Sequence, residues 1–478
     1  MEMLLDFLNQ LGLGAGTGPF SDFWAVFKNG GFIFIIYTLV DGFAAVWINN
    51  RQAIFASKIK WVYLAIDVPR DNEQSPKAVE QIFNHVWGII KSPIFKEKWW
   101  DGYFQIGYSL ELVSVEGYIQ YIIRSADKNR NIVEAAVYAQ YPTAQITEIE
   151  DYIKDFMPDN FKEKGYDLWG AQLQELREDV YPIRTYPLFE HPVAKTIVDP
   201  MAALLEIFSR LGPGEQSWLQ IAIRPVHDDT WQKNSAAAVK KILGTPTEAK
   251  KASMIDQMID LPGQAITNLA DNFLISAKTE KKEQKLEVPS KMLYLSPGER
   301  QAVEAIETKA TKTGFQTKIR YIYIAKKENM NKATGISGFF GAYKQFGWLN
   351  GFKPHNQAST IANYWFKGRR LLKNQKRILK QYKSRSLWSG VNAERGRFVL
   401  NIEELASLYH FPYKGVGPAA VKTVGAKRAE APYILPVETF ADKEKEEARV
   451  SKHNANMLKA NSETNHFDVE IPPDNLPV

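Results

Sequence analysis

The densest set of side chains that could do chemistry lies between residues 367 and 385, where the sequence reads KGRRLLKNQKRILKQYKSR. Guanidinium and ammonium groups donate hydrogen bonds to phosphate oxygens, so this run predicts contact with nucleic acid, an anionic lipid surface or an acidic protein. The alternative is the solvated face of a packed helix, which charge runs usually form. The run has no acidic residue, and its predicted anion-binding side chains are Lys367, Arg369, Arg370, Lys373, Lys376, Arg377, Lys380, Lys383 and Arg385.

An amphipathic helix is the element that must position these cations. Apolar side chains recur through the run at helical spacing and would leave a basic face opposite them. The predicted packed face contains Leu371, Leu372, Gln375, Ile378, Leu379 and Tyr382.

The sequence contains no recognisable catalytic motif. It has no G-x-x-x-x-G-K-[ST] phosphate loop and no G-x-S-x-G elbow, and its seven histidines show no metal-ligand spacing. The absence of cysteine excludes thiolate metal sites and cysteine nucleophiles. We therefore expect no catalytic residue, no metal and no cofactor, and the sequence does not predict an enzyme.

Residues 31–48 read GFIFIIYTLVDGFAAVWI, with one charge in eighteen residues. A helix of this length spans ~27 Å, just enough for a bilayer core, so we expect a single-pass transmembrane helix after an N-terminal segment, 1–30. The alternative is a buried helix of a globular core. Basic residues behind the run favour an inner (cytoplasmic) membrane location with the bulk of the chain cytoplasmic. Asp41 inside the span would be a membrane-assembly contact.

The remaining sequence predicts an α+β fold with two ferredoxin-like units of the β-α-β-β-α-β type. The first unit covers 58–155, with a helix that begins at Ser75-Pro76 and a hairpin at Glu116-Gly117. The second covers 180–350, begins with a strand at 181–188, and is split by a polar helical insertion at 227–291. Residues 351–440 contain the basic helix, and 441–478 form a polar tail expected to be disordered.

A glycine-rich segment, GISGFFGAYKQFGWLNG at 335–351, brings several aromatic residues together. Small residues beside aromatic ones allow close backbone approach, either to a partner or to the bilayer surface. The favoured alternative is ordinary internal packing, because exposed aromatic patches are the exception.

Three stretches carry a resemblance to a known family: SWLQIAIRP at 217–225, FVLNIEELASLYHFP at 398–412 and APYILP at 431–436. They resemble the region before the ATPase core in TraG/TraD-like and HerA-like coupling ATPases of type IV secretion and conjugation. The matching positions are Val399, Leu400, Asn401, Glu403, Glu404, Leu405, Ala406, Leu408, His410 and Pro412. Where those relatives enter the phosphate loop, this sequence continues into the polar tail.

The resemblance implies a membrane-anchored, non-catalytic assembly or adaptor subunit that docks to a separate P-loop ATPase and to other proteins of a transfer machine. The predicted docking segment contains Glu403, Glu404, Leu405, Leu408 and His410, although His410 also fits a purely structural histidine. The alternative is a membrane-proximal nucleic-acid-binding protein that holds DNA with 367–385. The oligomeric state stays open, and a homo-oligomer is among the partners considered.

Overall fold

The structure is a computed structural model of the 478-residue chain. It describes residues 27–28, 32–69, 72–156, 158, 160–189, 199–226, 229–243, 295–363, 365–387 and 397–412. The predicted disordered tail, 441–478, and most of segment 1–30 lie outside these residues, as does most of the insertion at 227–291.

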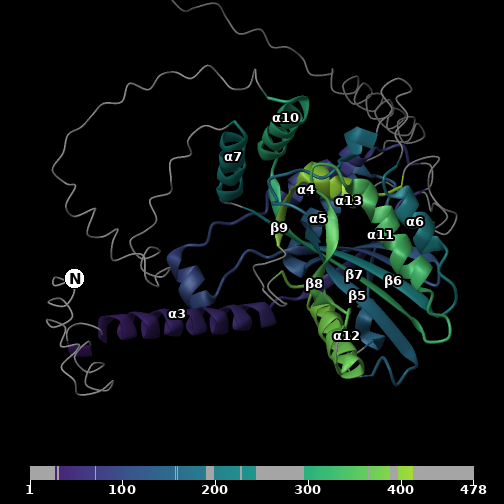
Figure 1. Ribbon diagram of the computed structural model, residues 1–478, viewed down its shortest axis with the longest axis horizontal. Helices are drawn as coiled ribbons and strands as arrows, with labels where there is room; N and C mark the ends of the chain where they lie inside the picture. The colour runs from purple at the N-terminus through teal and green to yellow at the C-terminus, as the bar shows by residue number, and fades with distance from the viewer. Residues whose placement is uncertain are drawn as a thin grey trace, which may run out of the picture. The chain divides into compact units, whose positions relative to one another are not determined.

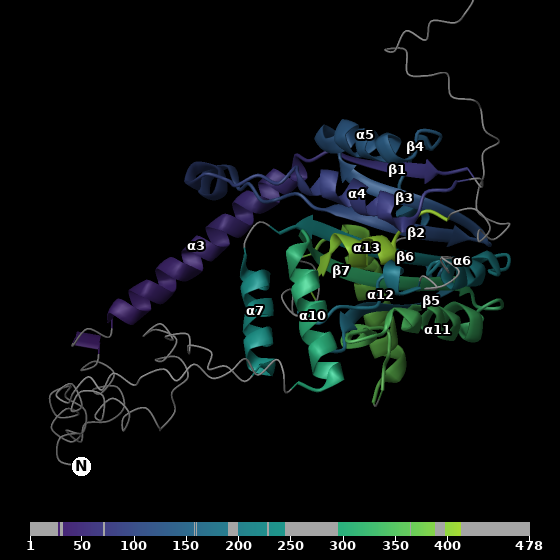
Figure 2. The same cartoon turned by 90° about the horizontal axis from the view of Figure 1, so that it is seen from above.

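The fold is a mixed α+β structure built on one antiparallel sheet, which confirms the predicted class (Figure 1). Eight strands follow one another across the sheet in the order β4-β1-β3-β2-β6-β7-β5-β8 (Figure 2). The ninth, β9 (Phe398–Asn401), pairs with the first residues of β7. The bounds across the sheet are β4 Gln145–Ile149, β1 Trp61–Asp67, β3 Tyr118–Ala126, β2 Tyr108–Val115, β6 Glu215–Pro225, β7 Gly314–Lys326, β5 Tyr166–Glu175 and β8 Phe352–Ser359.

The first four strands come from the first predicted unit. Their chain order is β1, α4 (Pro76–Trp87), β2, β3, α5 (Arg130–Gln140) and β4. The helix α4 begins where predicted, with Ser75 at the N-cap position and Pro76 in the first turn. The hairpin between β2 and β3 turns at Glu116-Gly117, also as predicted.

The second half repeats this strand order, because β8-β5-β7-β6 corresponds to β4-β1-β3-β2. Two predicted boundaries were wrong. The segment 181–188 is not a strand, since it ends in the 3₁₀ turn Tyr186–Phe189, and the half instead begins with β5. Its last strand, β8, lies beyond the predicted end at residue 350.

The two halves join edge to edge into one sheet. Along the seam, eight residues of β2 pair with Gln216–Ile223 of β6, and Leu112 faces Leu219 near its centre. The backbone hydrogen bonds therefore continue without a break from the first predicted unit to the second.

Side chains on the two faces of the sheet build separate cores. The larger core packs beneath α4, α5, α6 (Ala202–Ser209), α11 (Phe339–Tyr343) and α13 (Ile402–Leu408). The other face carries a smaller core that α12 (Lys367–Ser384) covers together with the Tyr152–Asp155 turn (Figure 1). Burial of a Leu, Ile or Phe side chain stabilises the fold by about 1.5–3 kcal/mol each, so these cores hold α12 and α13 to the sheet.

Two helices from the second half stand side by side, away from the sheet (Figures 1 and 2). They are α7 (Thr230–Ile242) and α10 (Pro297–Thr311), which share a small core of Val239, Val303 and Ile306. A capping box of Ser296 and Glu299 begins α10. Of the predicted insertion, only 229–243 is described, and it is helical from 230 to 242 as expected.

The apolar run at 31–48 belongs to a longer helix, α3 (Phe32–Ser57). Its last turns rest on the π-helical segment Glu97–Asp101, where Trp47 Nε1 donates to the Trp99 carbonyl at 2.8 Å. Gly102 ends that segment with φ +69°, and a Cβ there would lie 2.3 Å from the Arg51 carbonyl group, so only glycine fits. Among the described residues, we find no helix with the length and apolarity needed to cross a membrane.

Candidate functional site

The basic helix α12 packs as predicted. Gln375, Ile378, Leu379 and Tyr382 are buried against the sheet, and Leu372 packs beside them. Gln375 Nε2 also donates to the Leu168 carbonyl at 2.7 Å, which ties the helix to β5. This packing fixes which cations can face outward.

The nine predicted cations divide into three groups by exposure. Lys367, Arg369, Arg370, Lys373 and Lys380 are exposed. Lys376, Arg377 and Lys383 are half-buried, and Arg377 donates to the Gln357 carbonyl at 2.5 Å. Arg385 is buried and differs from the prediction. The surface that a phosphate could reach is thus concentrated in the first two turns of α12.

Arg385 lies inside a buried polar cluster because it meets two carboxylates there. Its Nε donates to Glu111 at 2.7 Å, and its two terminal nitrogens donate to Asp151 at 2.8 and 2.9 Å. Burial alone would lower the pKa of Arg385, but Glu111 first, then Tyr152 and Asp151, raise it instead. The guanidinium is held charged by internal partners, so we remove it from the anion-binding surface.

Two aromatic side chains extend the exposed part of the basic surface. Trp365 is 83% exposed and Phe366 is 73% exposed, directly before the first basic residues. Phe366 adopts a left-handed conformation, φ 57°, at the N-cap of α12. The first turn contains no acidic side chain, although the helix dipole favours one there. Cations and exposed aromatic rings therefore meet at one helix end, which we call the α12 tip: Trp365, Phe366, Lys367, Arg369, Arg370 and Lys373.

The predicted docking segment is largely internal. Leu405 and Leu408 belong to the larger core. The two ring nitrogens of His410 lie 2.9 Å from Asp199 Oδ1 and 2.8 Å from the Ala406 carbonyl, which supports the structural alternative for this histidine. Glu403 contacts Lys312 at the rim of the core. These contacts make the segment a closing element of the fold.

Glu404 is the most constrained residue of that segment. It completes a capping box with Asn401, accepts from the Ile183 amide at 3.0 Å and lies 3.1 Å from Lys309 Nζ. The Lys309 contact has an ion-pair distance but not hydrogen-bond geometry. Burial raises the pKa of Glu404, and the nearby Lys309 charge opposes that rise.

Two further features predicted from the sequence are Asp41 and the glycine-rich segment 335–351. Asp41 lies exposed on α3. In the glycine-rich segment 335–351, Phe339 and Phe346 are fully buried, and the Phe339 ring stacks on Tyr321 at 3.6 Å between centroids. Internal packing, the favoured alternative, is confirmed for these aromatic residues.

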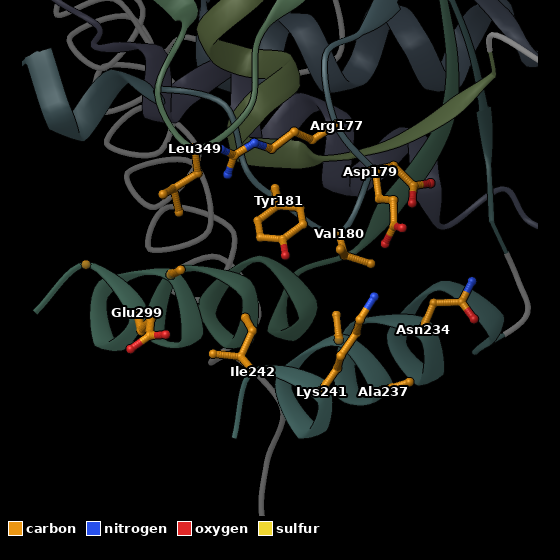
Figure 3. Close-up of a pocket in the computed structure, with 14 residues that line it drawn as sticks. Arg177, Asp179, Val180, Tyr181, Asn234, Ala237, Lys241, Ile242, Glu299 and Leu349 are labelled. Atoms are coloured by element: carbon orange, nitrogen blue, oxygen red, sulfur yellow. The ribbon is translucent and has the colours of Figure 1, made fainter. Parts of the chain in front are cut away.

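A wide cavity lies between the α7–α10 pair and the chain at 177–181 (Figure 3). Its volume is about 1150 Å³, and Figure 3 shows Arg177, Asp179 and Tyr181 above the two helices, with Lys241 below. Both charge signs alternate with small alanines along its wall, and its lining residues include no histidine, serine or cysteine that could pair with a base. Within the described residues, no group of three or more His, Cys, Asp or Glu could hold a metal.

Comparison with known proteins places this fold in a family without naming an activity. No curated protein matches the chain. A family model described as a domain of unknown function, DUF8128, matches residues 68–420, which contain every strand of the sheet except β1 together with all helices that cover it. The chain belongs to this family.

Proposed function

We propose that the chain is a membrane-anchored, non-catalytic assembly subunit of a type IV secretion or conjugation-like transfer machine, and that it docks to a separate P-loop ATPase. The membrane anchor is supported by the exposed apolar surface of α3 and of the segment 94–100 beside it. The resemblance at 398–412 supports the link to a transfer machine.

The first half of α3 presents apolar side chains to the outside. Seven of them are 53–69% exposed: Ile33, Ile36, Tyr37, Leu39, Val40, Phe43 and Val46. Folded proteins rarely leave so many neighbouring apolar side chains in water, so this surface requires a cover. At 100° per residue these seven positions cover about half of the helix circumference, a broader apolar surface than a narrow packing stripe, and a bilayer suits it.

Where α3 meets the segment 94–100, the exposed surface changes from apolar side chains alone to aromatic side chains mixed with basic ones. Ile94, Phe95 and Trp100 are exposed there, and Lys96 and Lys98 stand among them. On α3 itself, the Arg51 guanidinium lies 4.5 Å from the Trp47 ring centroid. Aromatic rings and lysines gather at the membrane–water interface. We call these residues the collar, and they mark the level at which the chain would leave the bilayer.

Beyond the collar, we infer that the sheet is a pair of ferredoxin-like modules. Each half has four antiparallel strands in the 4-1-3-2 order that the split β-α-β arrangement produces. Such modules serve many functions, so they support a scaffold without specifying its chemistry. Residues 398–412 add a strand to the second module and pack into the core of the first, which would leave outer surfaces for an ATPase to dock.

The test is a pull-down of full-length chain from detergent-solubilised native membranes, with identification of the co-purifying proteins. We expect the chain in the membrane fraction, together with a P-loop ATPase. The double variant Leu39→Arg/Phe43→Arg should shift it to the soluble fraction. Ile132→Arg/Tyr138→Arg, on exposed apolar residues of α5, is the matched control and should not. Wild-type chain in the soluble fraction, or no ATPase in the pull-down, would refute the proposal.

A second candidate, binding of single-stranded nucleic acid, rests on the α12 tip. Basic side chains beside exposed aromatic rings are the combination that holds a backbone while bases stack. Reversal of Lys367, Arg369, Arg370 and Lys373 to Glu should weaken binding of every sequence and reduce the salt slope by roughly 0.7 per lost phosphate contact. The control reverses four exposed cations elsewhere, Arg300, Lys327, Lys332 and Lys344. Equal losses in both variants would argue against a site at the tip.

A further inference from the structure

A small cavity lies at the base of α3, on the face of the sheet that α12 covers. Its volume is about 200 Å³, room for roughly six water molecules at ~30 Å³ each. Its wall contains Ala56 of α3, residues from the strands β1, β2, β3 and β6, and the turn after α12. Three arginines line it, Arg124, Arg224 and Arg385, and none of its described lining residues is acidic.

Arg124 is the cation that lacks a full set of partners. Its guanidinium carbon lies over the Trp61 ring, 3.5 Å from the centroid, and its Nε is buried with no hydrogen-bond acceptor among the described residues. Burial lowers the pKa of Arg124 to about 10, and the neighbouring Arg385 charge adds to that effect. A buried cation in this state gains from an anion that reaches it.

The nearby carboxylates are already engaged elsewhere. Glu111 accepts from Arg385, from Ser109 at 2.7 Å and from Tyr152 at 2.7 Å. Asp151 accepts from both terminal nitrogens of Arg385. Arg385 is therefore neutralised by its own cluster, which leaves the charge of Arg124 without a dedicated counterion in the described structure.

The strand register brings Arg224 to the same hollow. Arg124 pairs with Ser109 of β2, and Ser109 pairs with Ala222 of β6, so Arg224, two residues on, projects from the same face. Gly107 lies between these two arginines, and a Cβ there would come within 2.5 Å of the Ile223 carbonyl. Gly107 therefore allows β2 to approach β6 closely where the cavity lies. The hydroxyl residues Ser384 and Ser386 line its other side.

We propose that this cavity binds the phosphate group of a ligand, with Arg124 and Arg224 as its charged donors. Guanidinium groups present paired N–H donors that match phosphate oxygens. The phosphate could belong to a free anion or to a lipid headgroup, because the cavity touches the end of the proposed membrane helix. The site itself does not require the chain to be anchored.

The first test titrates inorganic phosphate into the detergent-purified full chain by calorimetry at constant ionic strength, with chloride as the reference. We expect saturable binding that Arg124→Gln weakens by about 10- to 100-fold, the loss typical of one charge-assisted hydrogen bond. Arg300→Gln, an exposed arginine on α10, is the control and should bind like the wild type. Ser386→Asp keeps Arg124 in place but adds a carboxylate to the wall, so it should also abolish binding.

The second test separates the two sources of phosphate. Full-length chain is floated with phosphatidylcholine vesicles that contain or lack phosphatidic acid. A gain from phosphatidic acid that disappears in Arg124→Gln and Ser386→Asp identifies a headgroup site, whereas calorimetric binding without that gain identifies a free phosphate. Flotation on phosphatidylcholine alone reports on α3 and not on the cavity. If neither probe depends on Arg124 or Ser386 while the variants remain folded, the proposal is wrong.

Discussion

At the scale of single residues, the buried Arg385 guanidinium is held by two carboxylates, Glu111 and Asp151. Arg385 is 5% exposed and Glu111 is fully buried, so loss of the guanidinium strands a carboxylate in the interior. We expect Arg385→Met to lower the free energy of unfolding by about 3–5 kcal/mol at neutral pH. Denaturant unfolding measures this, and Arg369→Met, on the exposed face of α12, should change stability by less than about 0.5 kcal/mol.

The same cluster predicts how acid acts on the fold. Burial alone would raise the pKa of Asp151, but hydrogen bonds and charge from Arg385 outweigh it and hold that pKa below its usual value. A carboxyl whose folded pKa is depressed stabilises the fold above its unfolded pKa, and this contribution is lost as pH falls through the folded value. We therefore expect the wild type to lose stability below about pH 4. Arg385→Met should show a smaller loss, and an unchanged acid limb would refute the assignment.

Lys318 makes the stability of the fold depend on pH in the alkaline range. It is buried on β7, and burial first, then the charges of Arg320 and Arg397, lowers its pKa to about 7. Between about pH 7 and pH 10 the unfolded chain keeps a proton that the folded chain has released, so stability rises with pH through this window. Lys318→Met should flatten that rise in denaturant titrations. Lys327→Met, at an exposed position nearby on the chain, should leave the slope as it is.

At the scale of elements, the sequence predicted those features of helices that depend only on neighbouring residues. The capping box at Ser296 and the apolar faces of α4 and α12 follow from side-chain spacing alone, and all three are present. The strand β5 was missed because Gly170 and two glutamines, Gln172 and Gln174, interrupt its apolar pattern. The strand β8 was missed because it lies at the sheet edge, where its sequence FKPHNQAS is polar and tolerates proline. Both strands depend on partners distant in sequence.

The contact between α10 and α13 depends on one buried ion pair. Lys309 and Glu404 have side chains that are 1% and 0% exposed, so both charges are withdrawn from water. Lys309→Met or Glu404→Gln should each destabilise the fold by about 3–5 kcal/mol, because each leaves one charge buried. The double variant should lose less than the sum of the two, with a coupling of about 0.5–3 kcal/mol. Additive losses would show that the charges do not interact.

At the scale of the whole molecule, the candidate site could be predicted only in part. The basic run was evident from composition, and its exposed half did form the α12 tip. The burial of Arg385 could not be foreseen, because Glu111 lies 274 residues away and Asp151 lies 234 residues away. The phosphate cavity has the same origin, since Trp61, Arg124, Arg224 and Ser386 come together only when both halves join at the β2–β6 seam.

The segment 398–412 joins the two halves of the sheet, because it pairs with one half and packs against the other. Residues 398–412 add β9 to β7 and then insert Leu405, Leu408, Tyr409 and Phe411 into the core of the first half. The Phe411 ring lies 5.2 and 5.1 Å from Tyr121 and Tyr141, so the end of one half seals the other. Four such side chains contribute about 6–12 kcal/mol, comparable to the entire stability of a domain.

We therefore expect a chain that ends at Pro412 to unfold cooperatively, and one that ends at Arg397 to lose its fixed tertiary structure. Near-ultraviolet circular dichroism and limited proteolysis in detergent measure this, with the full-length chain as the reference. Equal melting temperatures for the two truncations would show that the segment is not structural. In that case, docking to a partner would explain the sequence of residues 403–410 better than a structural role. Loss of structure only in the shorter chain would place any ATPase contact on the outer surfaces instead.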